Sequence, residues 1–210
     1  MSVEKIAQAV IDLEDEEALD LVQKAIDQGV DPLHILQDGV MAGLTGIGEL
    51  FANNEYFLGE LVMGGNLVEE CLAILEPLIP KAKGPKRGKV VIGAVQGDLH
   101  SIGYGLVAKQ LELAGYEVHD VGIDVPSMKF IDKAREVGAD IIGLSAFLVT
   151  TISYCKEILD YLNDMGLRDE FKVILGGAET NQAVADSFGA DGWAENAIEA
   201  VKLCDRLLDH

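Results

Sequence analysis

Asp98 and His100 are the residues of this sequence that most clearly suggest chemistry. They stand two apart in the segment 96–105 (QGDLHSIGYG), directly after the apolar run 90–95. A carboxylate can hold one imidazole nitrogen and leave the other free to bind a metal. The simpler alternative is that Asp98 or Ser101 caps the next helix and that His100 is an incidental exposed imidazole. One histidine supplies too few ligands for a zinc site built by protein alone, so a metal here would need a cofactor to complete its coordination.

Two later segments carry residues of a similar kind. Ser145 and Thr151 lie in LSAFLVTT, and Gly176 and Gly177 lie in LGGAET. The hydroxyls could simply cap the following helix, whereas paired glycines let another backbone or a flat ligand approach closely. Each signal is weak by itself.

The elements that must position these residues alternate between strands and helices. Strands are expected at 90–95, 118–121, 141–145 and 173–175, with a short fifth strand at 191–193, and amphipathic segments separate them. This alternation predicts an α/β domain over residues 90–210, with a flavodoxin-like (Rossmann-like) five-stranded parallel sheet. Ligands bind such sheets beyond the carboxyl ends of the strands, so the loops after strands one, three and four should carry the site.

Residues 1–80 have apolar residues at helical spacing, which predicts a bundle of four to five short helices. We place breaks between them at the acidic segment 15–17, at 29–32, at 51–56 and at 77–80. Residues 81–89 (KAKGPKRGK) are basic and contain Gly and Pro, so they are expected to form an exposed linker between the two domains.

Composition limits the partners. The chain has 210 residues and a formal net charge of −20, which opposes binding to a nucleic acid backbone. The sequence has no apolar run long enough to cross a bilayer, and its acidic, amphipathic start is unlike a signal peptide, so a cytoplasmic location without membrane binding is expected. Cys71, Cys155 and Cys204 lie far apart in helical patterns and are expected to be buried and unpaired.

Taken together, the three segments resemble the cobalamin-binding domain shared by methionine synthase, methyltransferase-associated corrinoid proteins and certain mutases. That family carries Asp-x-His-x-x-Gly, Ser-x-Leu and Gly-Gly at long, characteristic spacings. Here the first motif is Asp98 to Gly103, Ser145-Ala146-Phe147 is the second and Gly176-Gly177 is the third. The segments GELFANNEYFLGEL and LEPLIP also resemble the helical cap of methionine synthase and its smaller relatives, so the resemblance covers nearly the whole chain.

The resemblance implies a role for each matched residue. His100 would be the lower axial ligand of cobalt in a base-off/His-on cobalamin, with Asp98 holding its other nitrogen and Thr151 continuing the relay. Phe51 and Leu58 would cover the upper face of the ring. Phe147 replaces the family's Leu, Tyr104 and Gly59 stand where relatives often have Lys and Pro, and Ser145 would bond the buried nucleotide tail. The remaining expected cofactor contacts are Gly97, Leu99, Ser101, Ile102, Gly103, Val149, Gly176, Gly177 and Ala178.

The resemblance further implies a methyl carrier. Its cobalamin, as Co(I), would accept a methyl group from a donor-specific methyltransferase, and methyl-Co(III) would be presented to a second methyltransferase with a folate or thiol acceptor. A reductive activator of Co(II) would be a further partner. The donor stays open among methanol, methylamines, quaternary amines and aryl methyl ethers.

Three alternatives remain. A small cobalamin subunit of a carbon-skeleton mutase uses the same motifs but lacks a helical cap. A cobalamin-sensing regulator would need a DNA-binding segment, and this acidic chain offers no basic recognition helix. The last alternative is a flavodoxin-like domain that binds another ligand.

Overall fold

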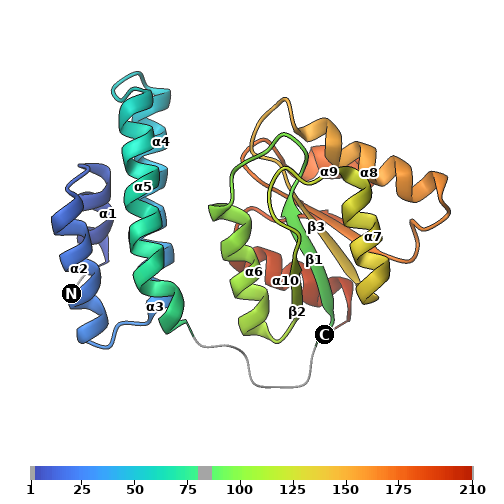
Figure 1. Cartoon of the computed structure of the whole chain (residues 1–210), viewed down its shortest axis with the longest axis horizontal. Coiled ribbons are helices and arrows are strands. Elements are labelled where there is room, and N and C mark those ends of the chain that lie inside the picture. The colour runs from blue at the N-terminus through green and yellow to red at the C-terminus, as the bar shows by residue number, and fades with distance from the viewer. Residues whose placement is uncertain (1–2, 80–86, 210) are drawn as a thin grey trace. The chain divides into compact units, whose positions relative to one another are not determined.

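The chain folds into two compact units, Met1–Pro80 and Lys81–His210, in a computed structural model that describes residues 3–79 and 87–209. We describe each unit by itself. Figure 1 shows the first unit as helices only and the second as a sheet covered by helices. Residues 81–86 of the predicted linker lie outside the described residues.

Within its described residues, the first unit consists of helices joined by short turns. Its helices are α1 (Glu4–Ile11), α2 (Asp15–Asp27), α3 (Pro32–His34), a π-helical segment η1 (Ile35–Met41), α4 (Ala42–Ala52), α5 (Leu58–Leu75) and the short 3-10 helix η2 (Glu76–Leu78). The segments α3, η1 and α4 follow one another without a break. The predicted helical bundle is therefore confirmed, and α5 fills the stretch between the predicted breaks at 51–56 and 77–80.

One predicted break is wrong. The acidic residues Asp15, Glu16 and Glu17 form the first turn of α2, and the chain turns earlier, at Leu13, which has a φ of 56°. Negative side chains at a helix N-terminus face the positive end of the helix dipole, so they favour a helix start there. The predicted break at 51–56 also begins too early, because α4 continues to Ala52.

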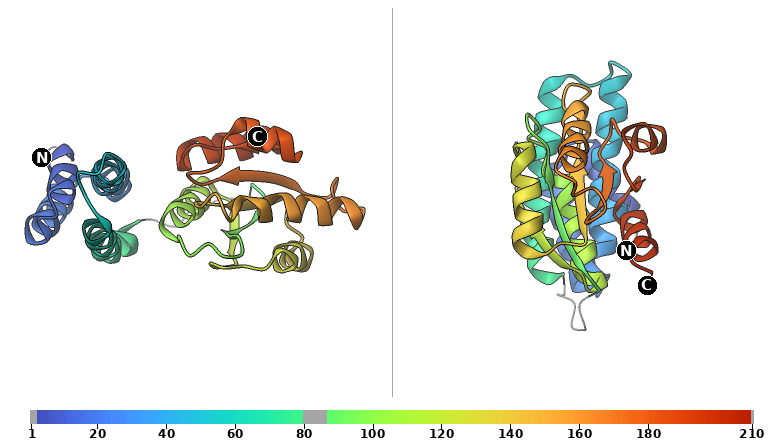
Figure 2. Two further views of the ribbon diagram at one scale, coloured as in Figure 1. Left: turned by 90° about the horizontal axis from the view of Figure 1, so that it is seen from above. Right: turned by 90° about the vertical axis from the view of Figure 1, so that its right-hand side faces the viewer.

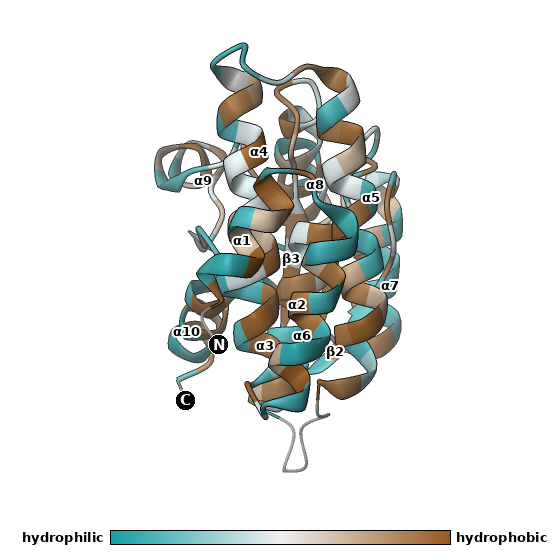
Figure 3. Ribbon diagram, turned by 90° about the vertical axis from the view of Figure 1, so that its left-hand side faces the viewer, coloured by the Kyte–Doolittle hydropathy of each residue, from teal (hydrophilic) through white to brown (hydrophobic). Residues whose placement is uncertain are grey.

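The apolar faces of these helices form the core of the first unit. Ile6 and Val10 of α1 are fully buried, as are Val22 of α2 and Ile47 of α4. A Cβ added at Gly43 would come within 2.5 Å of the Val10 Cβ, so glycine allows α4 to pack closely on α1. Figure 3 shows hydrophobic and hydrophilic residues alternating along α1 and α2, as expected for amphipathic helices.

The second unit contains a five-stranded parallel sheet. Its strands are β1 (Lys89–Ala94), β2 (Glu117–Asp120), β3 (Ile141–Ser145), β4 (Lys172–Gly176) and β5 (Gly192–Trp193), in the order β2-β1-β3-β4-β5. This is the flavodoxin-like order, so the predicted fold class is confirmed. The predicted strands differ from the observed ones by one residue at most ends.

Helices cover both faces of the sheet. The helices are α6 (Ile102–Ala114), α7 (Ser127–Val137), α8 (Ile152–Asp164), α9 (Gln182–Phe188) and α10 (Ala197–Leu207). Buried residues of α7, α8 and α9 pack on one face, and those of α6 and α10 pack on the other. Figure 2 shows α7 and α10 on opposite sides of the sheet. The inner strands β1, β3 and β4 are buried on both faces and almost continuously apolar, whereas the edge strand β2 (EVHD) is half polar and only partly buried.

The end of the predicted linker belongs to the sheet. Lys89 is the first residue of β1; its amide donates to Asp140 Oδ2 at 2.8 Å, and its Nζ donates to the Val137 carbonyl at 2.7 Å. Arg87 forms an ion pair with Asp205 at 2.8 Å. These residues are fixed by contacts that the sequence pattern did not reveal.

All three cysteines are buried and free, which confirms that expectation. Within the described residues, we find no helix with the length and apolar character that a membrane span requires.

Candidate functional site

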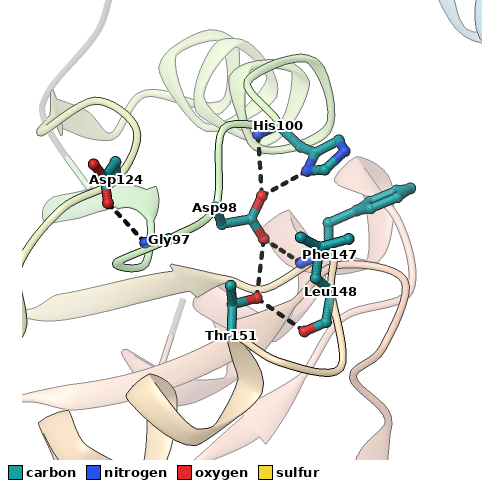
Figure 4. A network of polar contacts seen from close by, with 7 residues as sticks. All are labelled: Gly97, Asp98, His100, Asp124, Phe147, Leu148 and Thr151. Atoms are coloured by element: carbon teal, nitrogen blue, oxygen red, sulfur yellow. Dashed lines mark hydrogen bonds and ion pairs between the residues drawn. The ribbon is translucent and has the colours of Figure 1, made fainter.

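The candidate site lies where the loops after β1 and β3 meet. The strands β1 and β3 are neighbours, but β2 lies on the other side of β1, so the chain leaves β1 and β3 in opposite directions. Such a switch point opens a crevice at the carboxyl ends of the strands. Figure 4 shows Asp98 and His100 from the first loop facing Phe147 and Thr151 from the second.

Asp98 is the centre of this cluster. Its Oδ1 accepts hydrogen bonds from the His100 amide at 3.0 Å and from His100 Nδ1 at 2.7 Å. Its Oδ2 accepts from the Phe147 amide at 2.5 Å and from Thr151 Oγ1 at 3.3 Å. The carboxylate is 0% exposed. These donors offset the cost of burying a charge.

The hydrogen bonds keep Asp98 ionised. Burial by itself would raise the pKa of its carboxyl, but the Phe147 amide and the amide and imidazole of His100 lower it, and the net effect is a pKa below the ordinary 3.8. At neutral pH the group is therefore a carboxylate, which can only accept hydrogen bonds.

His100 presents one ring nitrogen outward. Because Nδ1 donates to a carboxylate, the neutral imidazole carries its lone pair on Nε2. Nε2 has no hydrogen-bond partner among the described residues, and the side chain is 47% exposed. One face of the ring stacks on Phe147, with ring centroids 4.1 Å apart and an interplanar angle of 23°. This arrangement is that of a metal-binding histidine held by a carboxylate.

The simple capping explanation is wrong for the hydroxyls. Ser101 and Thr151 occupy the N-cap positions of α6 and α8, but neither side chain makes a capping hydrogen bond. Thr151 Oγ1 instead lies 2.9 Å from the Leu148 carbonyl and 3.3 Å from Asp98 Oδ2, so its single hydrogen serves one acceptor at a time. Asp98 receives the amide of His100, which precedes α6.

Ser145 and the pair Gly176-Gly177 lie at the ends of the neighbouring strands β3 and β4. Ser145 is buried at the end of β3, and its hydroxyl has no hydrogen-bond partner among the described residues, which leaves it available to a ligand. Gly177 has a φ of 105°, and a Cβ there would lie 2.2 Å from the Ala146 carbonyl oxygen. Glycine is therefore required for the β4 loop to pass this close to the β3 loop.

The other expected contacts in the second unit mostly line the accessible end of the sheet. Ile102 and Gly176 are partly buried, and the rest are exposed: Gly97, Leu99, Ser101, Gly103, Phe147, Val149, Gly177 and Ala178. Phe51 and Leu58 belong to the other unit, at the end of α4 and the start of α5. They are 42% and 67% exposed, so they are not part of the core of the helical unit.

Sequence reasoning missed three residues that hold the site loops. Asp124 accepts a hydrogen bond from the Gly97 amide at 2.7 Å. Thr180 Oγ1 donates to the Gly177 carbonyl at 2.7 Å and accepts from Trp193 Nε1 at 3.0 Å. The Gly-x-Asp turn after the second strand was a usable signal for Asp124, because it also lies at a strand end. Nothing local in the sequence marks the Thr180–Trp193 contact.

These features fit a cofactor that brings most of its own metal ligands. Among the described residues, no three His, Cys, Asp or Glu side chains are grouped so that they could hold a metal ion. His100 Nε2 is therefore a single available donor atom, and exposed apolar residues and glycines stand in the same loops, among them Gly97, Leu99 and Phe147. A macrocycle that holds a central metal by its own ring atoms needs only one further ligand from the protein, and His100 can supply it.

Comparison with known families agrees with this site. Residues 88–202 match the B12 binding domain family, and residues 2–76 match a second family that is also described as a B12 binding domain. The first match alone covers more than half of the chain, so the class is that of B12-binding proteins.

Similar proteins narrow the class. The chain is 42% identical to corrinoid protein DSY3155 of Desulfitobacterium hafniense and 42% identical to the dimethylamine corrinoid protein of Methanosarcina barkeri, each match covering 98% of this chain and 97% of the relative. This chain belongs to the family of corrinoid proteins. The resemblance noted in the motifs is thereby confirmed, and a flavodoxin-like domain for an unrelated ligand is excluded.

Solved structures agree with this assignment. The monomethylamine corrinoid protein of M. barkeri is 30% identical, with a TM-score of 0.90 over 97% of this chain and 96% of that chain. The methanol:cobalamin methyltransferase complex MtaBC of M. barkeri is 27% identical, with a TM-score of 0.56 over 99% of this chain and 79% of that chain.

Proposed function

We propose that this protein is a corrinoid methyl carrier that accepts a methyl group from a donor-specific methyltransferase and delivers it to a second methyltransferase. Its similarity to dimethylamine and monomethylamine corrinoid proteins over nearly the whole chain supports this role. A mutase subunit is disfavoured because residues 2–76 match the second B12 binding domain family, as expected of a carrier with a helical cap.

The Asp98–His100 pair is the observation that carries the proposal. His100 Nε2 would bind the cobalt of a base-off/His-on cobalamin, because donation from Nδ1 to Asp98 leaves the lone pair of the neutral imidazole on Nε2, which faces outward. When bound, the cobalamin supplies the nucleophilic metal that takes and gives the methyl group. Ser145 would bond the buried tail, and Gly97, Gly176 and Gly177 would admit it between the loops.

Asp98 and Thr151 would contribute to the hydrogen bonding around His100. A metal and a proton would bind the same lone pair on His100 Nε2, because Nδ1 donates to Asp98 at 2.7 Å. Thr151 can turn its hydroxyl hydrogen from Leu148 toward Asp98 and so adjust to the charge of the pair. Ligation and proton uptake at Nε2 are thus alternatives.

The partners follow from the role. The solved methanol:cobalamin methyltransferase complex supports a donor methyltransferase as one partner. We further propose an acceptor methyltransferase with a folate or thiol substrate and a reductive activator that rescues Co(II). The relatives' names favour a methylamine as the first donor to test. A cytoplasmic location stays a prediction from the sequence.

The test reconstitutes the full chain with cobalamin under reducing, anaerobic conditions. The wild-type protein should bind it and give the absorbance spectrum of a histidine-ligated, base-off cobalamin. His100→Ala should still bind cobalamin, because the tail contacts remain, but its spectrum should lose the histidine ligand. His34→Ala is the matched control, since His34 is also held by a carboxylate, Asp38, at 2.6 Å but lies on the helical unit.

Two results would contradict the proposal. Wild-type protein that takes up no cobalamin would remove the carrier role altogether. Cobalamin binding with the same spectrum in wild type and His100→Ala would remove the axial role of His100 while leaving a corrinoid protein.

A further inference from the structure

Phe147 contacts the Asp98–His100 pair in two ways. Its amide donates to Asp98 Oδ2 at 2.5 Å, and its ring stacks on the His100 imidazole with centroids 4.1 Å apart. The two contacts come from one residue of the β3 loop, whereas Asp98 and His100 come from the β1 loop. Figure 4 shows the phenyl ring beside the imidazole.

The stack restrains a motion that the carboxylate leaves free. The bond from His100 Nδ1 to Asp98 Oδ1 fixes the distance of the imidazole, but a single hydrogen bond lets the ring swing about that line. A flat aromatic neighbour on one face opposes this rotation, because tilting the ring breaks the stacked contact. The direction in which Nε2 points is therefore set by the carboxylate and the phenyl ring together.

Packing of the core does not explain the Phe147 side chain. It is 45% exposed, and it lies beyond the end of β3, outside both core clusters of the sheet. Leu148 and Val149 follow it and are also exposed, yet only Phe147 has a ring contact with His100. Its one specific side-chain partner among the described residues is the imidazole.

We propose that Phe147 is a positioning residue that holds the His100 imidazole in the orientation required of an axial ligand. This inference rests on the proposed function, since it concerns how His100 reaches a metal. Phe147 acts through His100 and does not itself bind the metal. An aromatic residue at this position orients the His100 imidazole before the cofactor binds, so less ordering of that side chain is needed on binding.

The experiment compares Phe147→Leu, which removes the stack but keeps a branched apolar side chain, with Phe147→Tyr, which keeps it. Each full-length variant is loaded with cobalamin and reduced to Co(II). EPR then measures the fraction of cobalt with an axial nitrogen. Labelling histidine with 15N distinguishes a histidine nitrogen from the cofactor's own base, and loss of that signal in His100→Ala identifies His100. Met165→Ala is the matched control, because Met165 is exposed and apolar but lies at the C-cap of α8, whereas Phe147 precedes the N-terminus of that helix.

Phe147→Leu should lower the ratio of His-ligated to unligated cobalt roughly two- to tenfold, the range of an aromatic pair. Phe147→Tyr and Met165→Ala should keep the wild-type ratio. In the protein without cofactor, NMR should show the His100 ring protons losing their ring-current shift in Phe147→Leu only. The NMR change tests the stack in the absence of any corrinoid.

The outcomes separate the two proposals. If the wild-type protein binds no cobalamin, the proposed function is wrong. If it binds cobalamin but shows no histidine nitrogen on cobalt, the axial role of His100 is wrong. If wild type is His-ligated and Phe147→Leu has the same ratio, Phe147 does not position His100 and the inference is wrong. An equal loss of His-ligated cobalt in Phe147→Leu and Phe147→Tyr would also overturn the inference, because Phe147→Tyr keeps the stacked ring.

Discussion

At the scale of single residues, the site is held together by the hydrogen bonds that the Asp98 carboxylate accepts. Asp98 accepts four hydrogen bonds, two on each oxygen, and it is fully buried. Two of these donors are backbone amides, of His100 and Phe147, so Asp98 also ties the β1 loop to the β3 loop. Removing its charge should therefore affect stability as well as the orientation of His100.

Asp98→Asn should destabilise the protein without cofactor by about 1–3 kcal/mol, the usual cost of leaving a buried polar group unpaired. An asparagine has one acceptor oxygen, so either orientation points its NH2 group at a backbone amide, of His100 or of Phe147. Urea denaturation of the full chain measures the change.

Asp124→Asn is the control for this prediction. Asp124 is exposed, and its side chain accepts one hydrogen bond, from the Gly97 amide to Oδ1, which an asparagine oxygen can also accept. Its φ of 51° is also a conformation that asparagine adopts readily. A similar loss of stability in the two variants would show that the crowded donors at Asp98 are not the cause.

At the scale of elements, three helices carry a thiol on their buried faces. Cys71 lies on α5, Cys155 on α8 and Cys204 on α10. Burial, with a smaller contribution from nearby carboxylates, raises the pKa of Cys71 to about 11 and those of Cys155 and Cys204 to about 12, from an ordinary value of 9.0. The folded protein therefore favours the neutral thiols.

Folding stability should accordingly fall at alkaline pH. Below pH 9 the thiols are neutral in both states, so their contribution is fully present; above it the unfolded chain ionises first, and stability is lost as pH rises toward about 12. For Cys155 the loss between pH 9 and 10.5 should be roughly 2 kcal/mol. Urea midpoints measured across this range should show a shallower fall for Cys155→Ala than for wild type. Parallel curves for the two proteins would contradict the assignment.

At the scale of the whole molecule, the two units differ in what they leave uncovered. The sheet unit exposes His100 and its loops, whereas the helical unit exposes large apolar residues where α4 ends and α5 begins: Phe51, Phe57, Leu58, Val62 and Met63. Exposed apolar residues gathered at one end of a helix pair indicate a surface that contacts something else. We propose that Phe51 and Leu58 cover the upper face of the bound cobalamin.

Phe51→Ala and Leu58→Ala should therefore speed the photolysis and oxidation of the methylated, cobalamin-loaded protein severalfold. An apolar cover keeps water and oxygen from a reactive bond, and truncating it opens a path. Absorbance decay under light or air measures the rates. Leu78→Ala is the matched control, since Leu78 is exposed and apolar but follows the other end of α5. Decay at the wild-type rate in both cap variants would argue against the covering role.

The sequence by itself determined the class of fold and the family. Alternating apolar runs and amphipathic segments indicated the parallel sheet, since hydrophobic periodicity is a local property. The motifs at Asp98, Ser145 and Gly176-Gly177 indicated cobalamin through their resemblance to a known family, and their positions after strands one, three and four placed them at the carboxyl end of the sheet. Helix boundaries were less accurate: Asp15 to Glu17 are as suited to a first helical turn as to a break.

Only the tertiary structure decided what these residues touch. The stack of Phe147 on His100, the hydrogen bond from Gly97 to Asp124 and the contact of Thr180 with Trp193 of β5 join residues from different segments of the chain. Their partners are set by the register of strands β1 to β5 and by the close passage of Gly177 past Ala146. No local pattern encodes such contacts, because they exist only once the sheet has brought distant segments together.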